Sequence, residues 1–280
     1  MAEGNSRIPL LFAMLVMFQV QPAWALVKER TVSIATKSGP SLTGVLYAPQ
    51  DGSPSPGVLI LHTAGGLSQA DQVFAKRLAE SGFAVLTIAY SIGWAAPVNE
   101  QLAEAVDWLN RQPESQQMPV GVVGFSLGAS KALLVAALRP KTVKAVVAYY
   151  GTYNVEISKF KQAVQAARSK TGLEMPSPVQ VVSKIDGAIL LLQGEKDDET
   201  PESQTQQMRA TLNKSGKTYE IVIYPNAYHM FEREPQFHPS GFRTRFGTKT
   251  EYNPHAAQQS WEKSLSWLQQ HLKSTAPRRG

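Results

Sequence analysis

The clearest structural signal in this chain is the stretch Val120-Gly121-Val122-Val123-Gly124-Phe125-Ser126-Leu127-Gly128. Val120–Val123 is a short apolar run, which predicts a buried strand, and Leu127–Leu138 has a helical pattern. The pentapeptide between them matches G-x-S-x-G in the strand–turn–helix setting of a nucleophile elbow. A side chain at Gly124 or Gly128 would collide with the neighbouring strand or helix, which explains the two glycines. The alternative interpretation is a glycine-bounded turn that carries an unreactive serine.

Short apolar runs of the same kind recur along the chain and alternate with segments of helical pattern. The other predicted strands are Thr31–Thr36, Leu42–Ala48, Val58–Leu61, Ala84–Ala89, Val143–Tyr150, Ala188–Leu192 and Tyr219–Tyr224. The other predicted helices are Ala70–Ser81, Asn99–Arg111, Ile157–Thr171, Glu202–Ser215 and Ala256–Leu272. Unbroken apolar runs suit strands that are covered on both faces. The alternation predicts an α/β fold, a doubly wound and mostly parallel sheet flanked by helices, whose first two strands form an antiparallel edge.

The composition excludes several classes of function. The chain has 280 residues, 43% of them hydrophobic and 18% charged, as in an ordinary globular domain. Its net charge is +6, but the basic residues are scattered and form no stripe interleaved with aromatics. We therefore expect no binding to nucleic acid. A structural protein that binds polyanions is a further alternative, and its only support is the basic pI. The chain has no cysteine, which excludes thiolate metal sites and a cysteine nucleophile.

The N-terminal segment has the pattern of a secretory signal peptide. Arg7 precedes the apolar run Ile8–Phe18, and the triplet Ala23-Trp24-Ala25 follows it. A basic start, a short apolar core and an A-x-A triplet predict cleavage after Ala25. Residues 1–25 are then the signal peptide and residues 26–280 the mature domain, exported to the periplasm or secreted, with no stable membrane span. An uncleaved anchor or a buried helix is the alternative.

Activation of Ser126 requires a base, and His229 is the best placed of the five histidines. It follows the last predicted strand, at the sheet edge where the elbow also lies, and in this kind of hydrolase the order along the chain is serine, acid, histidine. His62 precedes the serine and is expected to be structural. His238, His255 and His271 are expected near the surface. A hydrogen-bonded loop histidine without catalytic function is the alternative for His229.

The acid is expected in the segment Gly194–Pro201, directly after the strand Ala188–Leu192. We select Asp197 because a short loop should turn its side chain toward the elbow, and Asp198 is the second choice. An acidic turn exposed to solvent is the alternative interpretation for Asp198 and Glu199. The carboxylate would hold the imidazole in the required tautomer.

A reacting carbonyl also needs hydrogen-bond donors for its oxyanion. The backbone N–H of Leu127 is one, and the glycine-containing loop after Val58–Leu61 supplies the other, from Ala64 or, as the close alternative, Thr63. The loops 91–98, 152–177 and 232–253 are expected to shape a pocket. Candidate substrate-binding side chains are Trp94, Tyr150 and Phe231, with core packing as the alternative for each.

From about residue 30 to residue 272 the chain resembles the dienelactone hydrolase family of the α/β-hydrolase superfamily. The resemblance rests on Leu61-His62 with its glycine-rich loop, Gly124–Gly128, Tyr149-Tyr150-Gly151, Gly194–Asp197 with Pro201, and Ala227–Phe231. It implies Asp197 as the acid, because the spacing from Asp197 to Pro201 matches the acid loop of the family. It also implies Ala64 as the second oxyanion donor. Two departures stand out. The name-giving enzymes have cysteine where this chain has Ser126, and glutamate where it has Thr63.

The resemblance implies a serine-using relative that hydrolyses carboxylic ester or lactone bonds of a small molecule. The expected route is a Ser126–His229–Asp197 triad and an acyl-enzyme, without metal or cofactor. Because of the two departures, the resemblance does not imply that this chain shares the lactone substrate of the name-giving enzymes. The rival interpretations are a peptidase or a thioesterase on the same scaffold, and a non-catalytic binding protein that has kept the fold.

Overall fold

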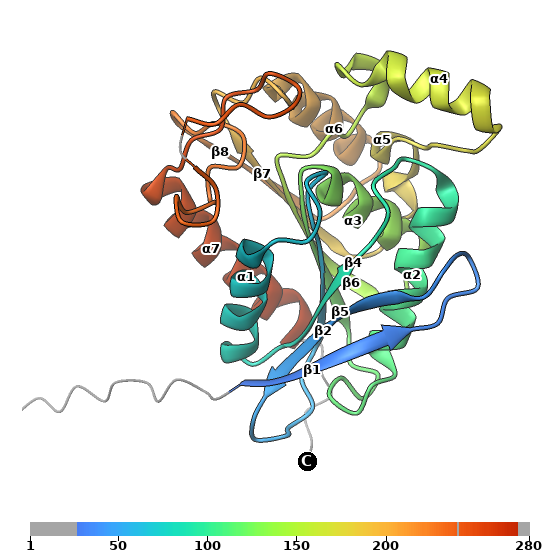
Figure 1. Ribbon diagram of the computed structural model, residues 1–280, viewed down its shortest axis with the longest axis vertical. Helices are drawn as coiled ribbons and strands as arrows, with labels where there is room; N and C mark the ends of the chain where they lie inside the picture. The colour runs from blue at the N-terminus through green and yellow to red at the C-terminus, as the bar shows by residue number, and fades with distance from the viewer. Residues whose placement is uncertain (1–26, 240, 274–280) are drawn as a thin grey trace, which may run out of the picture.

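The computed structural model describes residues 27–239 and 241–273 (Figure 1). The predicted signal peptide, residues 1–25, lies outside these ranges and stays a prediction. Among the helices of the described ranges, none combines the length and the apolar character needed to traverse a lipid bilayer.

One eight-stranded sheet forms the centre of the molecule, with the strand order β1-β2-β4-β3-β5-β6-β7-β8. The strands are β1 (Val27–Ile34), β2 (Leu42–Pro49), β3 (Gly57–Leu61), β4 (Ala84–Ala89), β5 (Val120–Phe125), β6 (Val143–Tyr149), β7 (Ala188–Gly194) and β8 (Tyr219–Tyr224). β1 pairs with β2, and β2 with β4, in antiparallel fashion, while the pairs from β4 to β8 are parallel. The predicted parallel sheet with an antiparallel edge is confirmed.

Helices cover both faces of this sheet (Figure 1). They are α1 (Gln69–Glu80), α2 (Ala96–Asn110), α3 (Leu127–Leu138), α4 (Lys161–Thr171), α5 (Pro178–Val181), α6 (Glu202–Lys214) and α7 (Pro254–Leu268), with short 3₁₀ turns at Val155–Ile157 and Val182–Lys184 and a π turn at Gln269–Lys273. Leu59 and Leu61 of β3 belong to the core cluster with α2, α3 and α6. Val58 and Ile60 belong to the cluster with α1 and α7. Alternate residues of one strand thus fill two cores.

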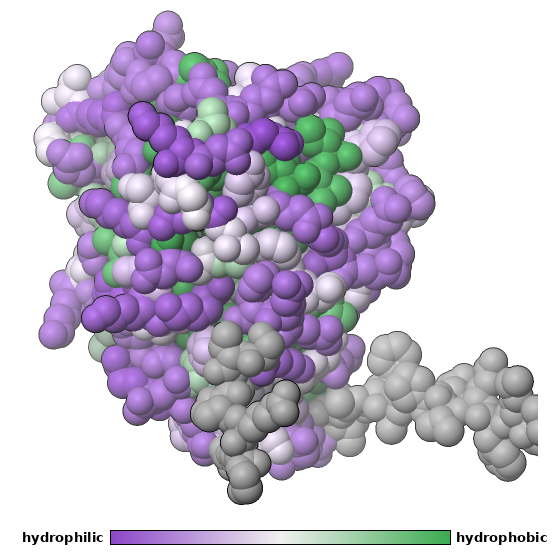
Figure 2. Space-filling model, turned by 180° about the vertical axis from the view of Figure 1, so that it is seen from behind, coloured by the Kyte–Doolittle hydropathy of each residue, from purple (hydrophilic) through white to green (hydrophobic). Residues whose placement is uncertain are grey.

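The surface over these cores is mainly polar. Figure 2 shows the face opposite to that of Figure 1, where hydrophilic side chains predominate and apolar ones gather in one area of the upper half. The apolar runs of the sequence therefore form the two cores, and the strand ends and loops remain to form the site.

Two of the element boundaries that differ from the predicted ones have clear physical reasons. β1 begins at Val27 rather than Thr31, because residues 28–30 pair with β2 and are all exposed, so they show no apolar alternation. α4 begins at Lys161 rather than Ile157. Asn154 caps a separate 3₁₀ turn at Val155–Ile157, and this turn interrupts the helical pattern.

Candidate active site

Ser126 lies in a sharp turn between β5 and α3. Its backbone has φ 53° and ψ −113°, a left-handed conformation that is strained for a residue with a side chain. A Cβ at Gly124 would overlap the backbone of Gly128, and a Cβ at Gly128 would overlap the carbonyl of Leu61 in β3. The crowding predicted for both glycines is confirmed, and the turn has the geometry of a nucleophile elbow.

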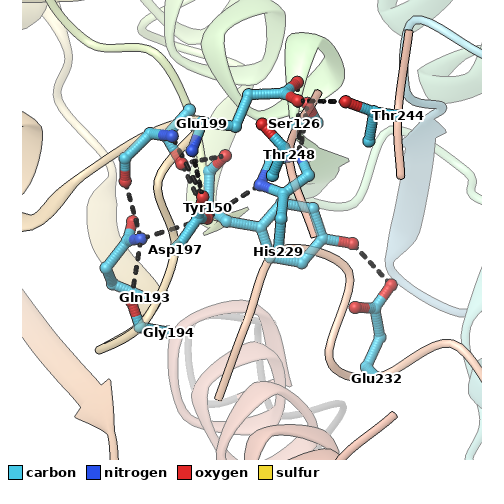
Figure 3. Close-up of polar contacts among 12 residues, drawn as sticks. Ser126, Tyr150, Gln193, Gly194, Asp197, Glu199, His229, Glu232, Thr244 and Thr248 are labelled. Carbon is cyan, nitrogen blue, oxygen red and sulfur yellow. Dashed lines mark hydrogen bonds and ion pairs between the residues drawn. The ribbon is translucent and has the colours of Figure 1, made fainter. Parts of the chain in front are cut away.

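A hydrogen-bonded row joins three side chains from three loops (Figure 3). His229, in the loop after β8, has its Nε2 3.1 Å from the hydroxyl oxygen of Ser126. Its Nδ1 is 2.7 Å from Oδ2 of Asp197, which follows β7. With Nδ1–H donating to the carboxylate, Nε2 is free to accept the serine proton. All three loops leave the carboxyl ends of parallel strands, and this common edge brings distant segments together.

Asp197 is held by donors on both of its oxygens. Oδ1 accepts the backbone N–H groups of Glu199 and Thr200 at 2.9 and 3.0 Å. Oδ2 accepts from the hydroxyl of Thr200 and from the amide of Gln193, besides His229. Asp198, the second choice for the acid, is exposed to solvent. The structure therefore places Asp197 and not Asp198 against the imidazole.

The charges around the row favour an ionised acid and a more basic imidazole. Burial alone would raise the pKa of Asp197, but His229 and the Thr200 donors hold that pKa below its usual value. Burial would likewise lower the pKa of His229, and this effect is outweighed by the carboxylates of Asp197, Glu199 and Glu232, so the pKa is raised. An imidazolium formed at His229 is thus stabilised by its surroundings.

A second buried network supports the other side of the imidazole. The ring of Tyr150 lies 4.6 Å from that of His229, and its hydroxyl donates to Oε1 of Glu232 at 2.6 Å. Arg233 pairs with the same Glu232 oxygen at 2.8 Å and with Asp71 at 2.7 Å, and it is almost fully buried. Between two carboxylates, the Arg233 pKa is raised despite burial.

Two cavities adjoin the row, of about 410 Å³ and about 370 Å³. The larger cavity is lined partly by the long segment 232–253, through side chains that include Phe237, His238 and Phe242. The smaller cavity is mostly apolar and is lined by Trp94, Phe160 and others. Both cavities share the same four lining residues, Ala64, Glu199, Arg245 and Phe246.

The candidate binding residues are therefore divided. Trp94 lines the smaller cavity, as expected. Tyr150 and Phe231 line neither cavity, because both side chains are completely buried in the core cluster around α7. The alternative of core packing describes these two residues, and Tyr150 supports His229 from behind instead of facing a ligand.

Both proposed oxyanion donors lie at the cavities. Leu127 is the first residue of α3, where a backbone N–H has no acceptor within the helix, and it lines the smaller cavity. Ala64 lines both cavities, and Thr63 lines the larger one. Ala64, which the family resemblance implies as donor, thus lies where the two cavities meet.

Glu199 is the functional candidate that the sequence interpretation missed. A solvent-exposed acidic turn was the alternative interpretation for Glu199, but its side chain is buried and its Oε1 lies 3.6 Å from Nε2 of His229. The hydrogen bonds from the backbone N–H groups of Glu199 and Thr200 to Asp197 wrap the loop around that acid and turn Glu199 inward. Four acids within residues 195–199 were the signal in the sequence, and the tertiary fold determines which of them are buried.

The remaining histidines have different environments. His62 is buried and stacks on Tyr90 at 3.9 Å, as befits its expected structural role. His255 is exposed, as predicted. His238 is half-buried instead, with its Nε2 2.9 Å from the hydroxyl of Thr250. Across residues 27–239 and 241–273, no group of three or more His, Asp or Glu side chains is arranged to hold a metal ion.

Comparisons with known proteins identify the family and the fold. The family model described as "Dienelactone hydrolase family" matches residues 90–272. A protein of Yersinia pestis, named as a carboxymethylenebutenolidase, is 26% identical over 248 residues, which are 81% of this chain and 83% of the relative. A protein of a Bradyrhizobium species, named as a 2-oxo-3-(5-oxofuran-2-ylidene)propanoate lactonase, is 25% identical over 260 residues, or 86% and 94% of the two chains.

Solved structures show the same fold. A crystal structure from Klebsiella pneumoniae, titled as a dienelactone hydrolase, superposes with a TM-score of 0.69 at 22% identity and covers 88% of this chain and 99% of its own. The elbow, the strand order and the family match lead to one assignment: the chain belongs to the dienelactone hydrolase family and is a hydrolase of the ester and lactone class.

Proposed function

We propose that this chain cleaves carboxylic ester or lactone bonds of a small molecule through a Ser126–His229–Asp197 triad and an acyl-enzyme. The observation that carries the proposal is the row of 3.1 Å and 2.7 Å contacts from the serine hydroxyl to the carboxylate. A serine hydroxyl attacks a carbonyl only when a neighbouring base accepts its proton. Support for His229 as that base comes from its position between the serine hydroxyl and a carboxylate, which favours the tautomer with the proton on Nδ1.

The proposed reaction has two halves. Ser126 Oγ attacks the carbonyl carbon while its proton passes to Nε2 of His229. The resulting oxyanion accepts from the backbone N–H groups of Leu127 and Ala64, and Asp197 stabilises the imidazolium. His229 then gives the proton to the departing alkoxide, which leaves an ester on Ser126. A water molecule, deprotonated by the same imidazole, attacks that ester. The bond between the acyl carbon and Ser126 Oγ then breaks, the carboxylic acid leaves, and Oγ takes the proton back from His229.

A fluorophosphonate probe tests this proposal together with a panel of p-nitrophenyl esters, lactones, thioesters and X-Pro amides. We expect the probe to add to Ser126, located by peptide mass spectrometry, and the esters or lactones to be turned over. Ser126→Ala should abolish both, whereas Ser203→Ala, on the exposed face of α6, should change neither. Preferred turnover of thioesters or amides would favour the rival activities. An unlabelled Ser126 in folded protein, with no turnover, would favour a binding protein.

We also propose that residues 1–25 direct export and are removed after Ala25. The support is the sequence pattern of Arg7, the run Ile8–Phe18 and Ala23-Trp24-Ala25. Expression of the full chain in a bacterium, followed by N-terminal peptide mapping of the exported fraction, should find Leu26 as the first residue. A chain that begins at Met1 and stays with the membrane fraction would contradict cleavage.

A further inference from the structure

Glu199 places a carboxylate beside the contact between His229 and Ser126. Its Oε2 accepts a hydrogen bond of 2.9 Å from the hydroxyl of Thr244, in the segment that covers the larger cavity. Its Oε1 faces Nε2 of His229 at 3.6 Å, and Nε2 is itself 3.1 Å from Ser126 Oγ. Figure 3 shows the carboxylate held by Thr244 on the side of the imidazole that faces Ser126.

The two cavities meet at this carboxylate. Glu199 lines both of them, as does Ala64, one of the proposed oxyanion donors. A carbonyl bound between Ala64 and Ser126 would extend its acyl and alcohol arms into the two cavities, past Glu199. The smaller cavity is mostly apolar, with Trp94 and Phe160 in its wall, so one arm is expected to be apolar.

The positive charges nearby leave this negative charge largely uncompensated. Arg233 lines the larger cavity, but Asp71 and Glu232 neutralise it. Arg245 lines both cavities but is exposed, so water screens its charge, and its guanidinium lies 4.7 Å from the ring of Phe246.

Three further titratable groups face the site. His238 lines the larger cavity, and burial beside Arg233 lowers its pKa, which keeps it neutral near pH 7. The Lys159 ammonium donates to Thr248 and is exposed. Asp197 is paired with His229. Within the described ranges, the ion-pair contact of Glu199 is to His229, which carries a positive charge only when it is protonated.

We infer that Glu199 is a specificity-determining residue, which directs the enzyme to uncharged esters with one apolar arm and disfavours a carboxylate near the scissile carbonyl. This inference rests on the proposed function. The physical basis is repulsion between two anions in a partly desolvated site, which acts in the bound complex and in the transition state. Removal of the Glu199 charge should also make His229 less basic, because this carboxylate helps to raise the pKa of the imidazole.

The test compares two p-nitrophenyl esters of equal chain length, the neutral hexanoate and the anionic monoester of adipate, with spontaneous hydrolysis subtracted. Wild type, Glu199→Gln and Asp198→Asn are measured, the last as a matched control because Asp198 is exposed in the same loop. We expect wild type to prefer the hexanoate in kcat/KM. Glu199→Gln should reduce that preference by about tenfold, the scale of one partly screened charge. Asp198→Asn should leave it unchanged.

The pH profile separates this role from a merely structural one. Glu199→Gln should move the acid limb of kcat/KM for the hexanoate to lower pH, because His229 loses a neighbouring anion. A merely structural role would lower the rates of both esters equally and leave the acid limb of the pH profile in place, and that result would overturn the inference. A wild-type preference for the adipate ester would overturn it as well. If wild type cleaves esters and Ser126 is labelled, such a result removes this inference alone. Failure of both labelling and turnover removes the proposed function, and the inference falls with it.

Discussion

Lys131 is a buried lysine whose replacement should stabilise the protein at acid pH and destabilise it at alkaline pH. It lies in α3 at 0% exposure, and its ammonium donates to Oδ1 of Asn99 in α2 at 2.7 Å. No ion pair of Lys131 is found in the described part of the chain. Burial lowers its pKa to about 7, from an ordinary value of 10.5. The folded protein therefore tolerates the neutral amine far better than the ammonium.

The size and sign of the effect follow from proton linkage. A tenfold change in proton affinity is worth about 1.4 kcal/mol, so a pKa lowered from 10.5 to about 7 corresponds to about 5 kcal/mol. Between these pH values the unfolded chain binds the proton and the folded chain does not, so stability rises with pH. Below pH 7 the full cost of burying the charge is present, and above pH 10.5 it has vanished.

Lys131→Met removes the titration and the hydrogen bond to Asn99, whose loss costs about 1–3 kcal/mol because a buried acceptor is left unpaired. The variant should be more stable than wild type at pH 6, by about 2–4 kcal/mol, and less stable at pH 10. Urea unfolding followed by circular dichroism at several pH values measures this difference. Lys141→Met, at an exposed position, serves as the control. A difference between wild type and Lys131→Met that stays constant from pH 6 to pH 10 would refute the reasoning.

Three other substitutions test separate parts of the structure. Asp197→Asn should lower kcat by about 10³–10⁴-fold, since the imidazole loses its tautomer and its counter-ion; an unchanged kcat in ester hydrolysis would contradict this. Gly128→Ala should destabilise the fold by about 3 kcal/mol or more, because the new Cβ overlaps a β3 carbonyl, whereas Gly93→Ala meets open space and should leave the Tm within a few degrees. Asp71→Asn should lower the free energy of unfolding by about 2 kcal/mol in urea titrations, because the buried Arg233 loses one of its two carboxylate partners and keeps Glu232; equal stability would show that the pair contributes little.

Most of the fold could be predicted from sequence because its central strands are buried on both faces. Such strands read as short apolar runs, and the strand–turn–helix around Ser126 adds two glycines that the packing requires. The order of serine, acid and histidine then placed Asp197 and His229 at one sheet edge, where the structure finds them in hydrogen-bonding contact.

The parts that could not be predicted depend on contacts between distant segments. The direction of the Glu199 side chain is set by its loop around Asp197 and by Thr244, which comes 45 residues later. Tyr150 ends an apolar run, and only the packing against Phe231 and His229 shows that it points away from the cavities. The exposed residues 28–30 carry no apolar pattern, so the start of β1 could not be predicted without knowledge of its pairing with β2.

The central claim is that Ser126, His229 and Asp197 act as one catalytic unit, and a double-mutant cycle tests it most directly. kcat is measured for Ser126→Ala, His229→Ala and the double variant on one p-nitrophenyl ester. Because each single change removes the same proton transfer, we expect the double variant to be no slower than the slower single variant. Losses that multiply in the double variant, or turnover by Ser126→Ala close to that of wild type, would contradict the claim.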